Sequence, residues 1–147
     1  MNSKKNVSVL VIDSQGGGLG RQLVLSIKEI SGVRITAVGT NTVATSNMLK
    51  AGADEAATGE NSVITACRKA DFIIGPLGIV IADAMLGEIT PKMANAVAQS
   101  AAKRIFIPFS NCDNYIAGVG AFSTGRLIDD AVSSLKKLLN DFQNPWQ

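Results

Sequence analysis

The chain has 147 residues, a formal net charge of +2 and no histidine. A chain of this length is typical of one domain with its own core, so we expect a single domain over residues 1–147. Without histidine it cannot itself supply a Ser-His-Asp triad, a Cys-His pair or a His-ligated metal, and we expect no metal site. Its basic residues are scattered along the sequence, which disfavours a nucleic-acid partner.

Composition also bears on assembly and location. Hydrophobic residues make up 46% of the chain and charged residues 18%, more apolar side chain than a small monomer easily buries, which predicts a homo-oligomer such as a dimer. No apolar run is long enough to cross a bilayer and the polar start lacks a signal core, so we expect no membrane partner and a cytoplasmic location. The two cysteines, Cys67 and Cys112, form neither a disulfide framework nor a zinc site.

Apolar runs of strand length alternate with segments of helical period, the pattern of βα units and a parallel sheet. Five strands are predicted, at Val7–Asp13, Val33–Gly39, Glu55–Ala57, Asp71–Gly75 and Arg104–Phe109. Helices are predicted by apolar spacing at Leu19–Ile30 and Val63–Ala70, before the helix-ending Gly52, from Pro91 to about Ala102, and along the stripe Leu127, Ala131, Leu135 and Leu138. The alternation predicts a three-layer, Rossmann-like α/β fold.

The order of the strands follows from their turns. Strands one and four both end in glycine-rich turns, and ligands bind open parallel sheets where the strand order reverses. We therefore favour the order 3-2-1-4-5, which makes these turns neighbours. The flavodoxin-like order 2-1-3-4-5 is the alternative, and it would place residues 58–61 beside the first turn. Polar and glycine residues also follow strand five, at residues 110–114.

The turn after strand one carries the motif DSQGGGLGR at residues 13–21. Glycines permit a tight turn and let main-chain N–H groups at a helix N-terminus approach a phosphate. Gly16, Gly18 and Gly20 are more closely spaced than in G-x-G-x-x-G, and Arg21 and Gln22 do not match a Walker A loop. The motif predicts a phosphate-bearing ligand, and a purely packing role for the glycines is the alternative. The prediction requires that the main-chain amides at the start of this helix are free.

Strand two ends where NAD sites usually place an acidic residue for the ribose hydroxyls. Here Thr40 and Asn41 stand instead, and they are expected to bond a ribose or phosphate, or else Asn41 or Thr42 simply caps the next helix. The cofactor is therefore unspecified, with NAD(P) or another nucleotide among the candidates. The predicted binding residues are Ser14, Gln15, Gly16, Gly17, Gly18, Leu19, Gly20, Thr40, Asn41, Gly75, Pro76 and Gly78.

Groups suited to catalysis are few. The candidates are Asp13, Glu60, Glu88 and Asp113 as acids or bases, Cys112 as a thiol, and Arg21 or Lys92 as cations. Each has a structural alternative, such as a helix start, a turn or burial, so no catalytic residue is assigned. Cys67 lies on an apolar helical stripe and is expected in the core. Tyr115 is followed four positions later by Val119, so the Tyr-x-x-x-Lys pair of many dehydrogenases is missing.

Residues 77–89 are unusually apolar for a βα loop. They predict either a lid over the ligand or an oligomer contact, and we favour the contact because the chain has apolar surface to bury. Two functions remain open. One is a nucleotide or dinucleotide binder with or without oxidoreductase activity, and the other is a non-enzymatic, oligomeric ligand-sensing or regulatory module.

Four blocks of the sequence, residues 12–20, 39–61, 75–93 and 107–112, resemble a family of short bacterial proteins known as a domain of unknown function. The long runs GTNTVATSNMLKAGADEAATGEN and IGPLGIVIADAMLGEITPKMA are similar to that family's shared segments. Ser14 departs from the glycine of the family pattern. The resemblance spans nearly the whole chain and implies a Rossmann-like fold and a bacterial origin. It implies no activity and no catalytic residue.

Overall fold

The computed structural model of the protein describes residues 6–108 and 114–146. Its elements are β1 (Val7–Asp13), α1 (Gly18–Ile27), β2 (Val33–Gly39), α2 (Thr42–Lys50), β3 (Glu55–Thr58), α3 (Glu60–Lys69), β4 (Phe72–Pro76), the 3-10 helix η1 (Leu77–Val80), α4 (Pro91–Gln99), β5 (Lys103–Ile107) and α5 (Thr124–Gln143). The five strands form one parallel sheet in the order β3-β2-β1-β4-β5. This confirms the predicted Rossmann-like class and strand order, and excludes the flavodoxin-like order.

Several boundaries differ from the predicted ones. α1 ends at Ile27, so Ile30 packs against the core from beyond the helix. α4 ends at Gln99 because Ser100 takes an extended backbone, with ψ 141°. β5 ends at Ile107, and its predicted end, Phe109, lies outside the described residues. α5 is the longest helix, and its buried face consists of Ile128, Ala131, Val132, Leu135 and Leu139.

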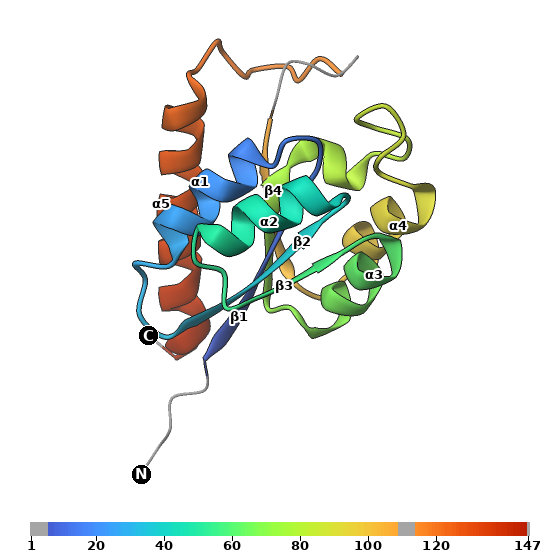
Figure 1. Ribbon diagram of the computed structural model, residues 1–147. Coiled ribbons are helices and arrows are strands. Elements are labelled where there is room, and N and C mark those ends of the chain that lie inside the picture. The colour runs from blue at the N-terminus through green and yellow to red at the C-terminus, as the bar shows by residue number, and fades with distance from the viewer. Residues whose placement is uncertain (1–5, 109–113, 147) are drawn as a thin grey trace.

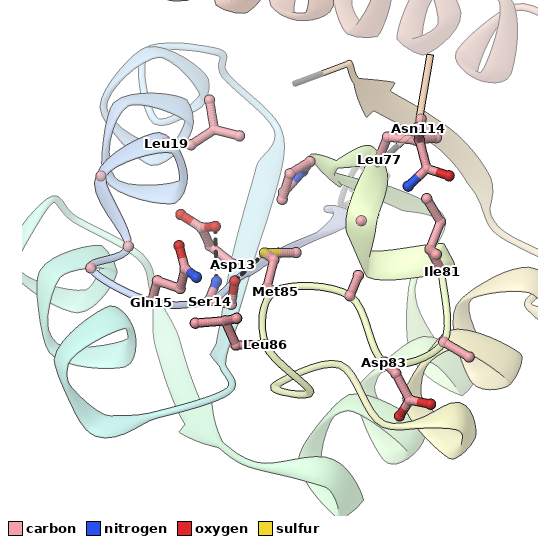
Figure 2. A pocket seen from close by; sticks show the side chains of 17 residues that line it. Asp13, Ser14, Gln15, Leu19, Leu77, Ile81, Asp83, Met85, Leu86 and Asn114 are labelled. Carbon is pink, nitrogen blue, oxygen red and sulfur yellow. Dashed lines mark hydrogen bonds between the residues drawn. The ribbon is translucent and has the colours of Figure 1, made fainter. Parts of the chain in front are cut away.

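The turns that follow β1 and β4 meet at the carboxyl edge of the sheet. They are neighbours because β1 pairs directly with β4, with Val9 opposite Phe72 and Val11 opposite Ile74. This pairing requires a glycine at position 75, because a Cβ there would collide with the carbonyl oxygen of Ile12. Figure 2 shows the turn from Asp13 to Leu19 facing Leu77 and Ile81 across this edge.

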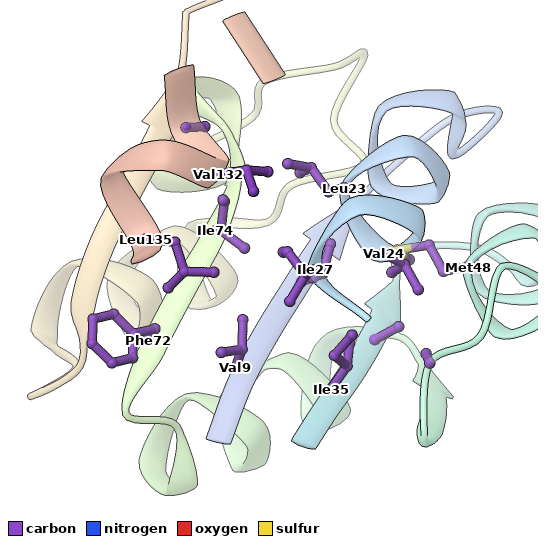
Figure 3. Close-up of a cluster of buried hydrophobic side chains, with 14 of the residues drawn as sticks. Val9, Leu23, Val24, Ile27, Ile35, Met48, Phe72, Ile74, Val132 and Leu135 are labelled. Carbon is purple, nitrogen blue, oxygen red and sulfur yellow. The ribbon is translucent and has the colours of Figure 1, made fainter. Parts of the chain in front are cut away.

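Helices cover both faces of the sheet (Figure 1), with α1, α2 and α5 on one face and α3 and α4 on the other. Alternate residues of β1 enter the two cores, since Val9 and Val11 pack with the first group and Leu10 and Ile12 with the second. Figure 3 shows the first core, where side chains of α1 and α5 meet those of the central strands. Burying one such Val, Leu or Ile side chain stabilises the fold by about 1.5–3 kcal/mol. The core thereby fixes the position of the β1 turn.

Residues 77–89 fold back onto their own chain. Ile79 and Ile89 are fully buried in the second core, whereas Leu86 is 98% exposed. The loop after η1 is closed by two backbone hydrogen bonds, from the Asp83 amide to the Ile89 carbonyl and from the Ile89 amide to the Ala84 carbonyl. Within it Asp83, Met85 and Leu86 take the left-handed backbone, with φ of 63°, 56° and 58°. Non-glycine residues in this region are strained, and such strain is typical of functional loops.

None of the helices within residues 6–108 and 114–146 combines the length and apolar character that a bilayer crossing requires.

Candidate functional site

A cavity of about 640 Å³ lies between the glycine-rich turn and the segment after β4. Its volume falls within the range of about 300–1,000 Å³ usual for small-molecule sites. Its lining consists of residues 13–19 from the first turn, residues 76–78 and 81–86 from the segment after β4, and Asn114. Figure 2 shows Met85 and Leu86 reaching toward Ser14 from one side, with Leu77, Ile81 and Asn114 on the other.

The N-terminus of α1 lies at this cavity. Gly17 is the N-cap, and Gly18 and Leu19 are the first two residues of the helix. Within the described residues the amides of Gly18 and Leu19 have no hydrogen-bond acceptor, and the amide of Gly16 has none either. Such N–H groups, together with the helix dipole, favour an anion. The requirement set by the sequence, free amides at this turn, is therefore met in part.

Two of the turn's glycines are explained by packing and two are not. A Cβ at Gly17 would lie 2.6 Å from the Cα of Ala44 in α2, and one at Gly20 would lie 2.8 Å from the Cβ of Asp13. At Gly16 and Gly18 a Cβ would meet nothing within 4 Å, and neither residue has a positive φ. Packing therefore accounts for Gly17 and Gly20, and close approach of a ligand would account for Gly16 and Gly18.

Asp13 ends β1 with a carboxylate that serves the turn itself. The residue is 5% exposed, and its two carboxylate oxygens accept hydrogen bonds from the amides of Ser14 (2.8 Å) and Gly20 (2.7 Å). Burial raises the pKa of Asp13 above its ordinary value of 3.8, the two amides partly oppose this, and the charge of Glu88 adds to the rise. Asp13 thus organises the start of α1 and takes one amide that a ligand would otherwise use.

Glu88 closes the part of the site that lies at the end of β2. Its Oε1 accepts hydrogen bonds from Thr40 Oγ1 (3.0 Å) and Asn41 Nδ2 (2.7 Å), and its Oε2 accepts one from the Gln15 amide (3.0 Å). Asn41 also donates to the Gln15 carbonyl, and its Oδ1 caps α2 by accepting from the Ala44 amide. The capping alternative for Asn41 is therefore confirmed, and both predicted β2-end donors are bonded within the chain.

Two further contacts hold the turn in place. Ser14 is buried, and its hydroxyl donates to the sulfur of Met85 in the loop above. Asn47 of α2 donates from Nδ2 to the carbonyl of Gly16 at 2.8 Å. The turn is thereby tied to α2 on one side and to residues 81–89 on the other, so its conformation is fixed before any ligand binds.

The structure brings most of the predicted binding residues to the cavity. Ser14, Gln15, Gly16, Gly17, Gly18, Leu19, Pro76 and Gly78 line it. Gly20, Thr40, Asn41 and Gly75 lie outside the lining, and their binding roles stay predictions. Residues 81–86 also line the cavity. The apolar run at residues 77–89 predicted either a lid over the ligand or an oligomer contact, and the lid, which places this segment near the ligand, was the alternative that we did not favour.

The remaining candidate residues do not line the cavity, where the structure describes them. Glu60 starts α3 and accepts a hydrogen bond from Thr90 Oγ1 at 2.6 Å, so it anchors the end of the loop. Cys67 lies in the second core as predicted, where burial raises its pKa to about 11. Arg21 and Lys92 are exposed and outside the cavity lining. Cys112, Asp113 and the rest of residues 110–113 lie outside the described residues. Elsewhere, in the described ranges, no cluster of Cys, Asp and Glu could hold a metal.

A parallel sheet of order 3-2-1-4-5 with a glycine-rich turn after its first strand defines a Rossmann-like α/β protein. Residues 8–140 match the family described as Domain of unknown function (DUF3842), and the chain belongs to that family. This confirms the resemblance found in the sequence. No curated protein matches the chain.

Two solved structures are distantly similar to this chain. A dodecameric FMN-dependent Ubix-like decarboxylase from Escherichia coli O157:H7 is 16% identical with a TM-score of 0.47, over 89% of this chain and 75% of that one. A nucleoside-diphosphate-sugar epimerase from Pseudomonas aeruginosa is 11% identical with a TM-score of 0.47, over 90% of this chain and 46% of that one. These likenesses are too remote to carry an argument about activity.

Proposed function

We propose that the protein binds a phosphate-bearing small molecule of the nucleotide class in the cavity between the glycine-rich turn and residues 76–86. The observation that carries the proposal is the start of α1, where the amides of Gly18 and Leu19 line the cavity without an acceptor among the described residues. The phosphate would be held there by main-chain N–H groups and the helix dipole.

The two glycines that packing leaves unexplained support the same proposal. Neither packing nor a positive φ requires glycine at position 16 or 18, which leaves room for a functional reason. A phosphate resting against the backbone of Gly16 and Gly18 supplies one, since a Cβ would stand in its way.

A thermal-shift series with NAD, NADP, FAD, ATP, GTP and S-adenosylmethionine tests the proposal. A ligand present at 100 times its dissociation constant adds about 2.7 kcal/mol to the free energy of unfolding. The shift should disappear in Gly18→Val, whose side chain enters the cavity. Gly125→Val is the matched control, because Gly125 also lies in the first turn of a helix with open space around it, but in α5.

Loss of the shift in Gly18→Val but not in Gly125→Val supports the proposal. An unchanged shift in both variants would mean that the ligand does not bind at the turn. If no compound produces a shift, the proposal is refuted and the packing role of the glycines is the remaining explanation of the turn.

A non-enzymatic sensing role is the second candidate, and the lining of the cavity favours it over catalysis. Among its described residues only Asp13 and Asp83 are ionisable, and Asp13 is already bonded to two amides. We keep the predicted homodimer as part of this candidate, with the exposed Leu86 as the contact to test by replacing it with Ser and measuring the molecular mass in solution.

A further inference from the structure

The hydrogen-bond donors at the end of β2 are already engaged by an acidic side chain of the same chain. Glu88 accepts from Thr40, Asn41 and the Gln15 amide, at 3.0, 2.7 and 3.0 Å. In dinucleotide sites an acidic residue after the second strand receives the ribose hydroxyls of one nucleoside. Here that place has the amide and hydroxyl donors, and the acid arrives from the loop after β4.

Glu88 therefore lies where the second nucleoside of a dinucleotide would need to go. A ribose at the end of β2 would have to displace a carboxylate that holds three hydrogen bonds, two of them from side chains and one from the main chain. Hydrogen bonds to a charged acceptor are stronger than neutral ones, so displacement is unfavourable.

The open part of the site extends in the other direction. The cavity lining comes from the first turn, the segment after β4 and Asn114, and includes no residue of β2 or α2. Beyond the α1 amides its walls include the apolar side chains of Pro76, Leu77, Ile81, Met85 and Leu86, together with the polar side chains of Asp83 and Asn114. A ligand whose phosphate meets Gly18 and Leu19 would thus extend its organic group toward β4.

We propose that Glu88 is a specificity-determining residue that restricts the ligand to a phosphate monoester with one nucleoside-sized group, and excludes dinucleotides. This inference rests on the proposed function, because it assumes that the phosphate binds at the start of α1. It extends the proposed function by stating which ligands the site accepts and which residue determines that choice.

Matched pairs of ligands test the inference. NAD contains nicotinamide mononucleotide plus AMP, and FAD contains FMN plus AMP, so each pair differs by the second nucleotide alone. Dissociation constants are measured by calorimetry for the wild-type chain, Glu88→Ala and Glu88→Gln. Glu60→Ala is the control, because Glu60 also bonds this loop, through Thr90, but lies outside the cavity lining. Circular dichroism and melting curves verify that each variant folds.

The wild-type chain should bind a mononucleotide, and the corresponding dinucleotide no more tightly. In Glu88→Ala the preference for the dinucleotide over its mononucleotide should rise about tenfold or more, which corresponds to 1.4 kcal/mol per factor of ten. Glu88→Gln should lie between the two, since its amide keeps one acceptor oxygen. Glu60→Ala should behave as the wild type.

Three results would overturn the inference in distinguishable ways. Tenfold tighter binding of NAD or FAD than of its mononucleotide by the wild type would refute the role of Glu88 and leave the proposed function intact. An equal gain for both ligands in Glu88→Ala would mean that Glu88 closes the whole cavity and does not select by size. No binding of any of these compounds to any variant would refute the proposed function itself.

Discussion

Gly17 and Gly18 are adjacent, yet alanine is expected to act on stability in opposite directions at the two positions. At Gly17 the left-handed backbone (φ 69°) costs alanine about 1–2 kcal/mol. Its Cβ would also lie 2.6 Å from the Cα of Ala44, a backbone atom that cannot rotate away, and such overpacking costs about 1–3 kcal/mol. The free energy of unfolding of Gly17→Ala should therefore fall by about 2–5 kcal/mol.

Gly18→Ala meets neither obstacle. The residue is helical, and a Cβ there has nothing within 4 Å, so the free energy of unfolding should stay unchanged or rise by up to about 1 kcal/mol. Urea unfolding followed by circular dichroism measures both variants on one scale, since the free energy falls linearly with denaturant. The same Gly18→Ala protein should lose affinity for the nucleotide, because the methyl group enters the cavity.

The pair separates packing from ligand binding at this turn. If Gly18→Ala loses more than about 1 kcal/mol, glycine there serves the fold and the case for a phosphate weakens. If Gly17→Ala is as stable as the wild type, the close approach of α1 to α2 does not hold in solution.

Three further predictions concern the same edge of the sheet. Burial raises the pKa of Asp13, so the contribution of Asp13 to the free energy of unfolding is complete below pH 3.8 and is lost as pH rises through the raised pKa. Urea unfolding measured across this pH range should show the loss in the wild type and not in Asp13→Asn. Asn41→Ala removes the α2 cap together with the hydrogen bonds to Glu88 and the Gln15 carbonyl, so by urea unfolding it should cost more than Ser123→Ala, which removes the α5 cap alone and should cost about 0.5–2 kcal/mol. Leu86→Gly relieves a strained, 98% exposed residue, so its melting temperature should not fall.

The strand order could be predicted because its determinants are local. The turns after β1 and β4 are both rich in glycine, and Gly75 is required where the two strands meet. Val7–Ile12 is apolar except for Ser8, which is typical of a strand buried on both faces, and its residues enter both cores. Each of these signals is contained in a few consecutive residues, so each can be recognised from the sequence alone.

The closure of the β2 end could not be predicted, since it depends on residues far apart in the chain. Glu88 lies 47 residues beyond Asn41 and 73 beyond Gln15, and no spacing rule links an acid in one loop to donors in another. The loop that delivers it also breaks a local rule, because Asp83, Met85 and Leu86 take a backbone conformation that favours glycine. Apolar composition alone led us to favour an oligomer contact. Ile79 and Ile89 of this segment are buried within the chain and Leu86 is exposed, and the contact itself stays a prediction.

The loop after β4 therefore contributes to three features of this protein: the second core, the wall of the cavity and the end of β2. Ile79 and Ile89 anchor it in the core, Met85 and Leu86 form a wall of the cavity, and Glu88 bonds the donors at the end of β2. In a fold whose sheet is rigid, ligand choice resides in such loops. The two proposals therefore predict that a change at residue 88 alters which ligands fit, whereas a change at Gly18 alters whether a phosphate binds.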